Sequence, residues 1–123
     1  DGVMVAAHTV FTNDVTPRAT TPDLRQLRSS APDEHTLATF VRSGATIGAN
    51  ATIVCGYTIG AYAFIGAGAV VTRGAPDYAL MVGNPAKQIG WMCECGNRLD
   101  GDLACSHCGK RYERSREGIS LVP

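Results

Sequence analysis

The sequence has few aromatic residues and no net charge. Phenylalanine, tryptophan and tyrosine make up 7% of its 123 residues, and 11 basic side chains balance 11 acidic ones. A chain without net charge has no overall field to attract nucleic acid or an anionic membrane surface. It also lacks an apolar run long enough to span a membrane and a secretory signal pattern. We therefore expect a cytoplasmic protein with no nucleic-acid partner and no membrane span.

What the chain does contain is a repeat of six residues. Residues 41–76 divide into consecutive units whose first position is always Val or Ile and whose fifth is Ala, except for Tyr57. A period of six fits neither a helix nor an ordinary strand, and it is typical of a solenoid. The first positions are Val41, Ile47, Ile53, Ile59, Ile65 and Val71.

This repeat predicts an all-β fold, a left-handed parallel β-helix. Three units close a triangular coil of about 18 residues, with the first and fifth positions facing inward. Val5, Thr9 and Phe11 continue the same pattern near the start of the sequence. Since solenoids need about three repeats and a cap, we expect that coils before Asp1, contacts with other subunits, or both complete the core.

The sequence predicts two regions, a β-helix over residues 1–90 and a C-terminal zinc-ribbon-like appendage over residues 91–123. The period is interrupted at about residues 15–38, which contain three prolines and many hydroxyl side chains. Thr21–Leu24 could begin a single helical turn there. A long irregular insert in a compact repeat is usually functional or disordered. We favour a functional arm that reaches over a neighbouring surface, and a tolerated surface insertion is the alternative.

Four of the five cysteines form two closely spaced pairs, each followed by glycine. Such pairs are typical of metal-binding turns, and four thiolates suit a closed, structural Zn site. A disulfide is the alternative, but nothing in the sequence suggests secretion. Cys55 is expected to be a small thiol within the β-helix. His107 is expected to be a solvated residue of the second turn, with replacement of one cysteine as a ligand as the alternative. The expected ligands are Cys93, Cys95, Cys105 and Cys108.

The stretch that closes the repeat resembles a known family. Residues 66–73, leading to Val82-Gly-Asn-Pro-Ala-Lys87, resemble the closing coil of hexapeptide-repeat acyltransferases. This resemblance implies acetyl-CoA as co-substrate, bound in a groove between the subunits of a homotrimer. Small corner residues would let the coenzyme approach the backbone, and cations would meet its phosphates. The residues implied are Gly48, Gly66, Ala67, Arg73, Pro85 and Lys87.

A second stretch narrows the resemblance. Val10-Phe-Thr-Asn13-Asp14, followed by Pro17-Arg18-Ala19, resembles sugar-nucleotide N-acetyltransferases of bacterial surface polysaccharide biosynthesis. These act on the amino group of a UDP- or dTDP-linked 3-amino sugar. By this resemblance Asn13 lies near the amine and Arg18 contacts the substrate. His8 is an alternative general base, and Asp14 an orienting residue.

Three other interpretations remain open at this point. The same fold supports O-acetylation of a sugar or an amino acid. A γ-class carbonic anhydrase would need several histidines across coils, whereas the β-helix offers His8 and the insert His35. A non-catalytic, zinc-stapled interaction module is the third. The ribbon has equal numbers of acidic and basic residues, which argues against nucleic-acid binding, and we expect it to cap the solenoid or contact a subunit.

Overall fold

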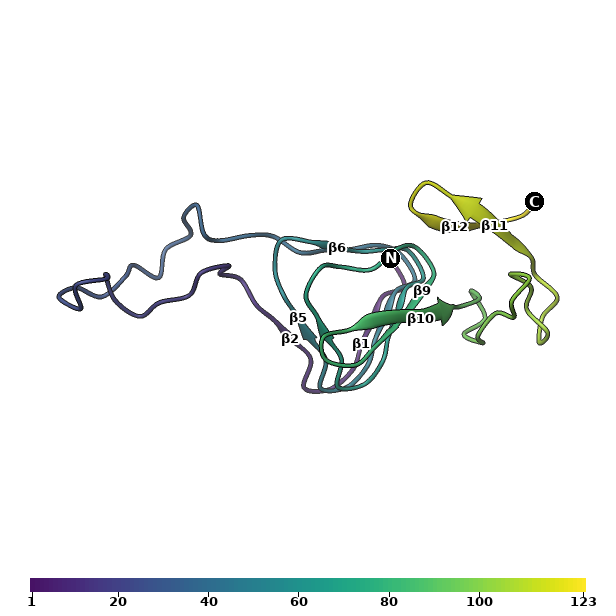
Figure 1. Ribbon diagram of the computed structural model, residues 1–123, viewed down its shortest axis with the longest axis horizontal. Coiled ribbons are helices and arrows are strands. Elements are labelled where there is room, and N and C mark those ends of the chain that lie inside the picture. The colour runs from purple at the N-terminus through teal and green to yellow at the C-terminus, as the bar shows by residue number, and fades with distance from the viewer.

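The computed structural model describes all 123 residues and contains no helix (Figure 1). No helix could therefore cross a membrane. Most of the strands are two residues long, as expected when each six-residue unit supplies one short strand and one corner. In chain order they are β1 (Met4–Val5), β2 (Val10–Phe11), β3 (Phe40–Val41), β4 (Thr46–Ile47), β5 (Thr52–Ile53), β6 (Thr58–Ile59), β7 (Phe64–Ile65), β8 (Val70–Val71), β9 (Ala79–Val82), β10 (Lys87–Trp91), β11 (Tyr112–Ser115) and β12 (Gly118–Leu121).

The first ten strands form the three faces of a prism. One face has the order β1-β4-β7-β9-β10, the second β2-β5-β8 and the third β3-β6. Within the prism the pairs are parallel and in register, so that Ile47 lies opposite Ile65, one coil of about 18 residues further on. The predicted solenoid is confirmed, and only the closing hairpin β9–β10 is antiparallel.

The prism core consists of the repeat's first and fifth positions. Ile47, Ile59 and Ile65 are fully buried, and the alanines at the fifth positions fill the space between them. Tyr57, the one fifth position that is not alanine, is 43% exposed because its ring does not fit the corner. Twelve residues form the cluster: Ala45, Ile47, Ala51, Ile53, Ile59, Ala63, Ile65, Ala69, Val71, Ala75, Ala79 and Met81.

Glycine at the second position of a unit allows adjacent coils to approach closely. A Cβ on Gly48 would lie 2.6 Å from the Ala67 amide nitrogen, and one on Gly60 would lie 2.4 Å from that of Asp77. Both neighbours are backbone atoms that the coil itself holds in place. These two corners therefore require glycine because of contact distance.

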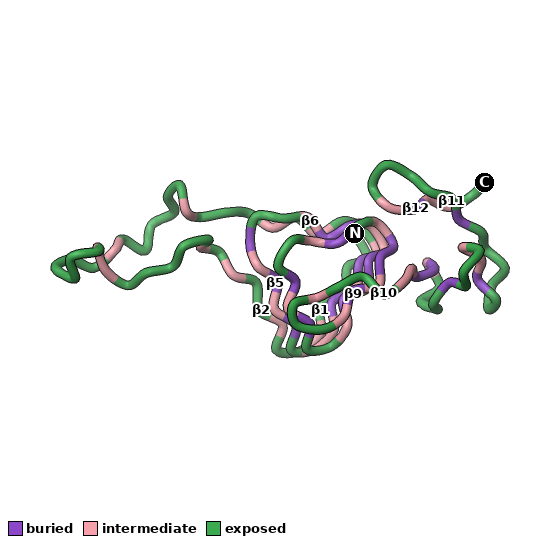
Figure 2. The backbone as a smooth tube through the Cα atoms, in the orientation of Figure 1, coloured by how far each residue is buried: buried purple, intermediate pink, exposed green.

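The first coil continues the repeat but leaves its apolar side chains open. Val5 lies opposite Ile47 and Phe11 opposite Ile53, in the predicted inward register. They are nevertheless 50% and 40% exposed, because no coil lies on their other side. In Figure 2 the buried residues accordingly gather in the stacked coils and the ribbon.

The insert is a long arm that leaves the prism between β2 and β3 (Figure 1). Antiparallel bridges Asp14–Thr36 and Thr20–Leu27 join its two sides. At residues 21–24 the Leu24 amide donates to the Thr21 carbonyl at 2.9 Å, so a single hydrogen-bonded turn forms, but no helix continues from it. Leu24 has a left-handed φ of 63°, and the Asp23 carboxylate accepts the Arg25 amide at 3.1 Å. Both features end the turn there.

The C-terminal residues form a separate small unit against the last coil. Strands β11 and β12 pair as an antiparallel hairpin. Buried Tyr78 joins the core of this unit to the prism, and Trp91 packs against both cores. The second core cluster consists of Tyr78, Cys93, Leu99, Cys105, Tyr112 and Ile119.

Candidate functional site

The predicted coenzyme and catalytic residues lie at the corners of the prism. His8, Asn50 and Gly68 occupy one corner of successive coils, with left-handed φ values of 61°, 60° and 72°. Hydrogen bonds from Asn50 N to Ala7 O (3.1 Å) and from Gly68 N to Ala49 O (2.8 Å) link these layers. The small residues at Gly48, Gly66 and Ala67 belong to the same corner, where coil backbones are in contact. The structure therefore places His8 in line with these predicted small residues.

Asn13 lies at a different corner. Strand β2 (Val10–Phe11) separates it from His8. There the Asn13 carbonyl accepts the Leu37 amide at 3.1 Å, and the Thr12 hydroxyl accepts the Cys55 amide at 3.0 Å. Hence one chain does not bring the two candidate catalytic side chains together.

A cavity of about 430 Å³ brings together three of the predicted coenzyme ligands, Arg73, Pro85 and Lys87. The loop that supplies it is tied to the prism by hydrogen bonds from Val70 N to Gly83 O (2.9 Å) and from Ala86 N to Val70 O (2.8 Å). Neither cation forms an ion pair with a carboxylate, so both remain available for an anion. The full lining is Thr72, Arg73, Gly74, Met81, Pro85, Ala86 and Lys87; the predicted glycines of the other corner are not part of it.

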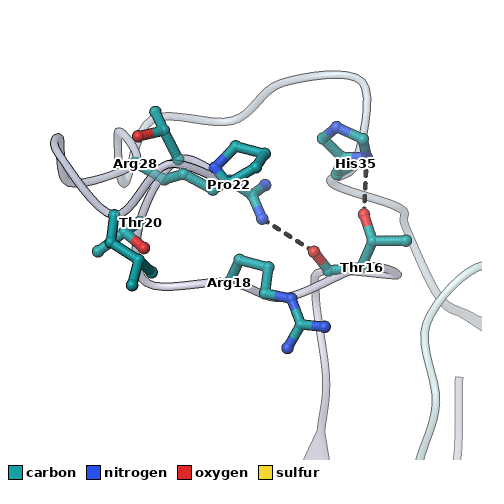
Figure 3. A pocket seen from close by; sticks show the side chains of 8 residues that line it. Thr16, Arg18, Thr20, Pro22, Arg28 and His35 are labelled. Carbon is teal, nitrogen blue, oxygen red and sulfur yellow. Dashed lines mark hydrogen bonds between the residues drawn. The ribbon is translucent and has the colours of Figure 1, made fainter.

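A second cavity, of about 600 Å³, lies within the arm (Figure 3). It contains the predicted substrate residue Arg18. Arg28 and His35 also line it, and sequence reasoning missed both, since only the folding back of the arm brings them opposite Thr16. The full lining is Thr16, Arg18, Thr20, Thr21, Pro22, Leu24, Arg28 and His35.

The Asp14 side chain makes its contacts at the base of the arm. Its carboxylate accepts the Thr16 amide at 2.8 Å and pairs with Arg28 at 3.2 Å. The role predicted for Asp14, that of an orienting residue, stays a prediction. The carboxylate holds the arm's first turn in position.

The four predicted cysteine ligands converge, and all their Sγ atoms lie within 4.8 Å of one another. Cys93 and Cys105 are buried, whereas Cys95 and Cys108 are exposed. The Asn97 side chain donates to Cys95 Sγ at 3.4 Å, and this bond, followed by the Asn97 backbone amide, lowers the pKa of that thiol to about 6. No histidine joins the cluster, and Cys55 stays apart as a buried thiol.

Hydrogen bonds and stacked rings connect this cluster to the prism. The Tyr112 hydroxyl lies 3.2 Å from Cys93 Sγ, and its ring packs edge-on against Tyr78, which stacks in turn on Tyr62. The Tyr78 hydroxyl donates to Glu94 at 3.0 Å, and Lys110 pairs with the same carboxylate at 2.6 Å. Burial, and then the Glu94 carboxylate, raise the pKa of Tyr78.

The C-terminal unit is also attached to the prism at the corner before β9. The Asp77 amide donates to the Glu117 carbonyl at 2.8 Å, and the Glu117 carboxylate pairs with Arg42. The appendage thus packs against a corner of the last coils, and its predicted role as a cap or a subunit contact stays a prediction. The three histidines lie in the prism, the arm and the ribbon, and none of them belongs to a cluster that could hold a metal within one chain.

Comparison with known proteins identifies related enzymes. No family model matches the chain. Over 78 residues it is 54% identical to dTDP-3-amino-3,6-dideoxy-alpha-D-galactopyranose 3-N-acetyltransferase from Aneurinibacillus thermoaerophilus. The aligned residues cover 61% of this chain and 40% of that protein. The chain thus matches less than half the length of this curated relative.

Solved structures show the same architecture. A maltose O-acetyltransferase from Clostridium difficile superposes with a TM-score of 0.60 and 30% identity, over 74% of this chain and 46% of that one. The Bacillus cereus N-acyltransferase AntD, as a mutant in complex with dTDP and coenzyme A, superposes with a TM-score of 0.55 and 21% identity. The superposition covers 73% of this chain and 49% of AntD. These similarities confirm the predicted left-handed parallel β-helix, and in sequence the chain is similar to hexapeptide-repeat acetyltransferases.

Proposed function

We propose that this chain acts in acetyl-CoA-dependent N-acetylation of a nucleotide-linked amino sugar, as part of bacterial surface polysaccharide synthesis. The observation that supports this most is the 54% identity to an enzyme whose name specifies a dTDP-linked 3-amino sugar. A cytoplasmic location belongs to the proposal, because the thiols of the four-cysteine cluster would stay reduced in that compartment.

In the proposed reaction the neutral sugar amine attacks the thioester carbonyl of acetyl-CoA. A C–N bond forms, the C–S bond breaks, and the departing thiolate takes up the proton that the amine loses. Asn13 would accept a hydrogen bond from the amine and direct its lone pair at the carbonyl. Alignment of two reactants contributes up to about 7–11 kcal/mol, so a strong base is not required.

A homotrimer is part of the proposal. Strand β2 separates the Asn13 corner from the corner that carries His8 and the predicted small residues, so one reaction would use both corners only if corners of two subunits face each other. A groove between subunits would do this, and the small residues of the His8 corner would let the coenzyme lie against the backbone.

We expect Asn13→Ala to lower kcat about 100-fold, the cost of a small misplacement of reacting groups. His8→Ala is expected to change kcat less than 10-fold, because the amine needs no general base; removal of a true base would cost about 10²–10⁴-fold. Steady-state release of the CoA thiol measures both. A larger loss for His8→Ala than for Asn13→Ala would reverse the two assignments.

The cavity around Arg73 and Lys87 is the proposed site for the coenzyme phosphates. Lys87→Ala should weaken CoA binding about 10-fold, since a hydrogen bond to a charged group contributes about 1.5 kcal/mol or more. Titration calorimetry measures this change. Arg116→Ala removes an exposed cation of the ribbon and should leave the affinity unchanged. Equal losses in both variants would indicate only a general charge effect.

O-acetylation is the second candidate, and the similarity to maltose O-acetyltransferase favours it. A matched pair of substrates separates the two reactions: a dTDP-linked 3-amino sugar and its counterpart with a 3-hydroxyl group. We expect acetyl transfer, detected by mass spectrometry, to the amine alone. Acetylation of the hydroxyl sugar would overturn the N-acetyltransferase assignment, and no transfer to either would favour a non-catalytic solenoid.

The four cysteines are proposed to hold one structural Zn²⁺ ion. Thiolate ligands suit zinc, and a site closed by four protein ligands leaves no position for a substrate or a water. When bound, the ion would join the two turns of the ribbon. The Tyr112 hydroxyl and the Asn97 amide would hydrogen-bond to the coordinating sulfurs of Cys93 and Cys95.

A further inference from the structure

The cavity in the arm has no role in the chemistry described so far. With about 600 Å³ it is the largest in the chain, and it is of the size that binds small molecules. It begins at Thr16, close to the corner that carries Asn13, and His35 closes the same end by a 2.9 Å hydrogen bond to the Thr16 hydroxyl (Figure 3). A ligand that reaches Asn13 could therefore extend into this cavity.

Hydrogen bonds hold the two sides of the arm together around the cavity. Arg28 is the central brace: its Nη1 donates to Thr16 O at 2.8 Å, and its Nη2 lies 3.2 Å from the Asp14 carboxylate and 3.8 Å from that of Asp33. Amides of both sides also pair, as in Val15 N to His35 O at 3.0 Å and Arg28 N to Ala19 O at 2.9 Å. The cavity is thus built by the arm's own contacts.

Arg18 is the other arginine of the cavity, and it is free. It forms no ion pair and no side-chain hydrogen bond, unlike Arg28, whose charge two carboxylates already balance. Thr16 and Thr20 add hydroxyl groups to the lining, and Pro22 with Leu24 adds apolar surface. An arginine with hydroxyl groups beside it is suited to phosphate oxygens, and an apolar wall is suited to the flat face of a base.

We propose that the arm cavity binds the nucleoside diphosphate part of the substrate, with Arg18 on the diphosphate and Arg28 as a positioning residue that keeps the cavity open. This inference rests on the proposed function. It divides the substrate between two places: the amino sugar at the Asn13 corner and the nucleotide within the arm. Coenzyme A would bind outside the arm cavity.

Binding of dTDP and of UDP to the full chain, measured by titration calorimetry, tests this assignment. Arg18→Gln should weaken the tighter of the two nucleotides at least 10-fold and leave CoA affinity unchanged. The matched control is Arg25→Gln, because Arg25 lies on the same arm but outside the cavity lining. The control should bind nucleotide as the wild type does.

Three results would overturn the assignment. They are absence of dTDP and UDP binding to the wild type, equal nucleotide binding by Arg18→Gln and wild type, and a loss of CoA affinity in Arg18→Gln. Inorganic pyrophosphate and thymidine, titrated separately, assign the phosphate and base contacts; only pyrophosphate should respond to Arg18→Gln. If nucleotide binding depends on Arg18 but no amino sugar is acetylated, the proposed reaction fails while the site stands.

Discussion

Replacement of Cys105 with serine is expected to abolish zinc binding and to unfold the ribbon, residues 91–123. Cys105 is 2% exposed, and its Sγ lies 3.6 Å from that of Cys95. The core of the ribbon is too small to stabilise it alone, whereas structural zinc contributes about 10–16 kcal/mol of apparent binding free energy in comparable small folds. Metal content by mass spectrometry and hydrogen exchange over residues 91–123 measure the two effects.

The control for this variant is Cys55→Ser, which changes a buried cysteine far from the cluster. It should keep stoichiometric zinc and a protected ribbon. In Cys105→Ser the prism should retain slow exchange at its isoleucines, because their core cluster contains no ribbon residue other than the half-buried Trp91 at its margin. Full zinc content in Cys105→Ser would contradict the assignment of the four ligands.

Ile59→Ala is expected to lower the free energy of unfolding of the prism by about 2–5 kcal/mol, the range for loss of a buried isoleucine side chain. Ile59 is completely buried, between the coil that begins at β3 and the one that ends at Ala75. A solenoid has contacts only between neighbouring coils, so a cavity there weakens both interfaces of the middle coil. Denaturant unfolding followed by far-UV circular dichroism measures the change.

Ile89→Ala is the matched control, since Ile89 is 45% exposed at the bulge of β10. Its effect should stay within about 0.5 kcal/mol, as is usual at surface positions. If both isoleucine variants lost the same stability, the inward first position of the repeat would not be the principal source of the prism's stability.

The prism itself could be predicted from sequence because its physical cause is periodic. An aliphatic residue at every sixth position can be buried only if the chain turns a corner within each unit, and alanine at the fifth position fits where the corner is tight. The pairing of Ile47 with Ile65 follows directly from three units per coil. The convergence of the four thiols was equally predictable, because two closely spaced Cys pairs, each in a turn, are typical of a shared metal site when the cysteines are not in disulfides.

The arm and its cavity could not be predicted in the same way. The contacts of Arg28 with Asp14 and Asp33 depend on how an irregular segment folds back, and no repeat encodes that. The turn at residues 21–24 does not extend into a helix, because Leu24 has a left-handed φ and the Asp23 carboxylate accepts the Arg25 amide. Likewise, the aromatic contact between Tyr78 and Tyr112 joins residues far apart in sequence, and nothing local to either one signals it.

Binding of coenzyme A at the corners and closing hairpin of this prism can be measured by hydrogen exchange of the full chain with and without CoA. We expect CoA to protect residues 72–74 and 81–87, around Arg73 and Lys87, and to leave exchange across the ribbon hairpin β11–β12 unchanged. Unchanged exchange at both segments in saturating CoA, or protection confined to the ribbon, would contradict this expectation.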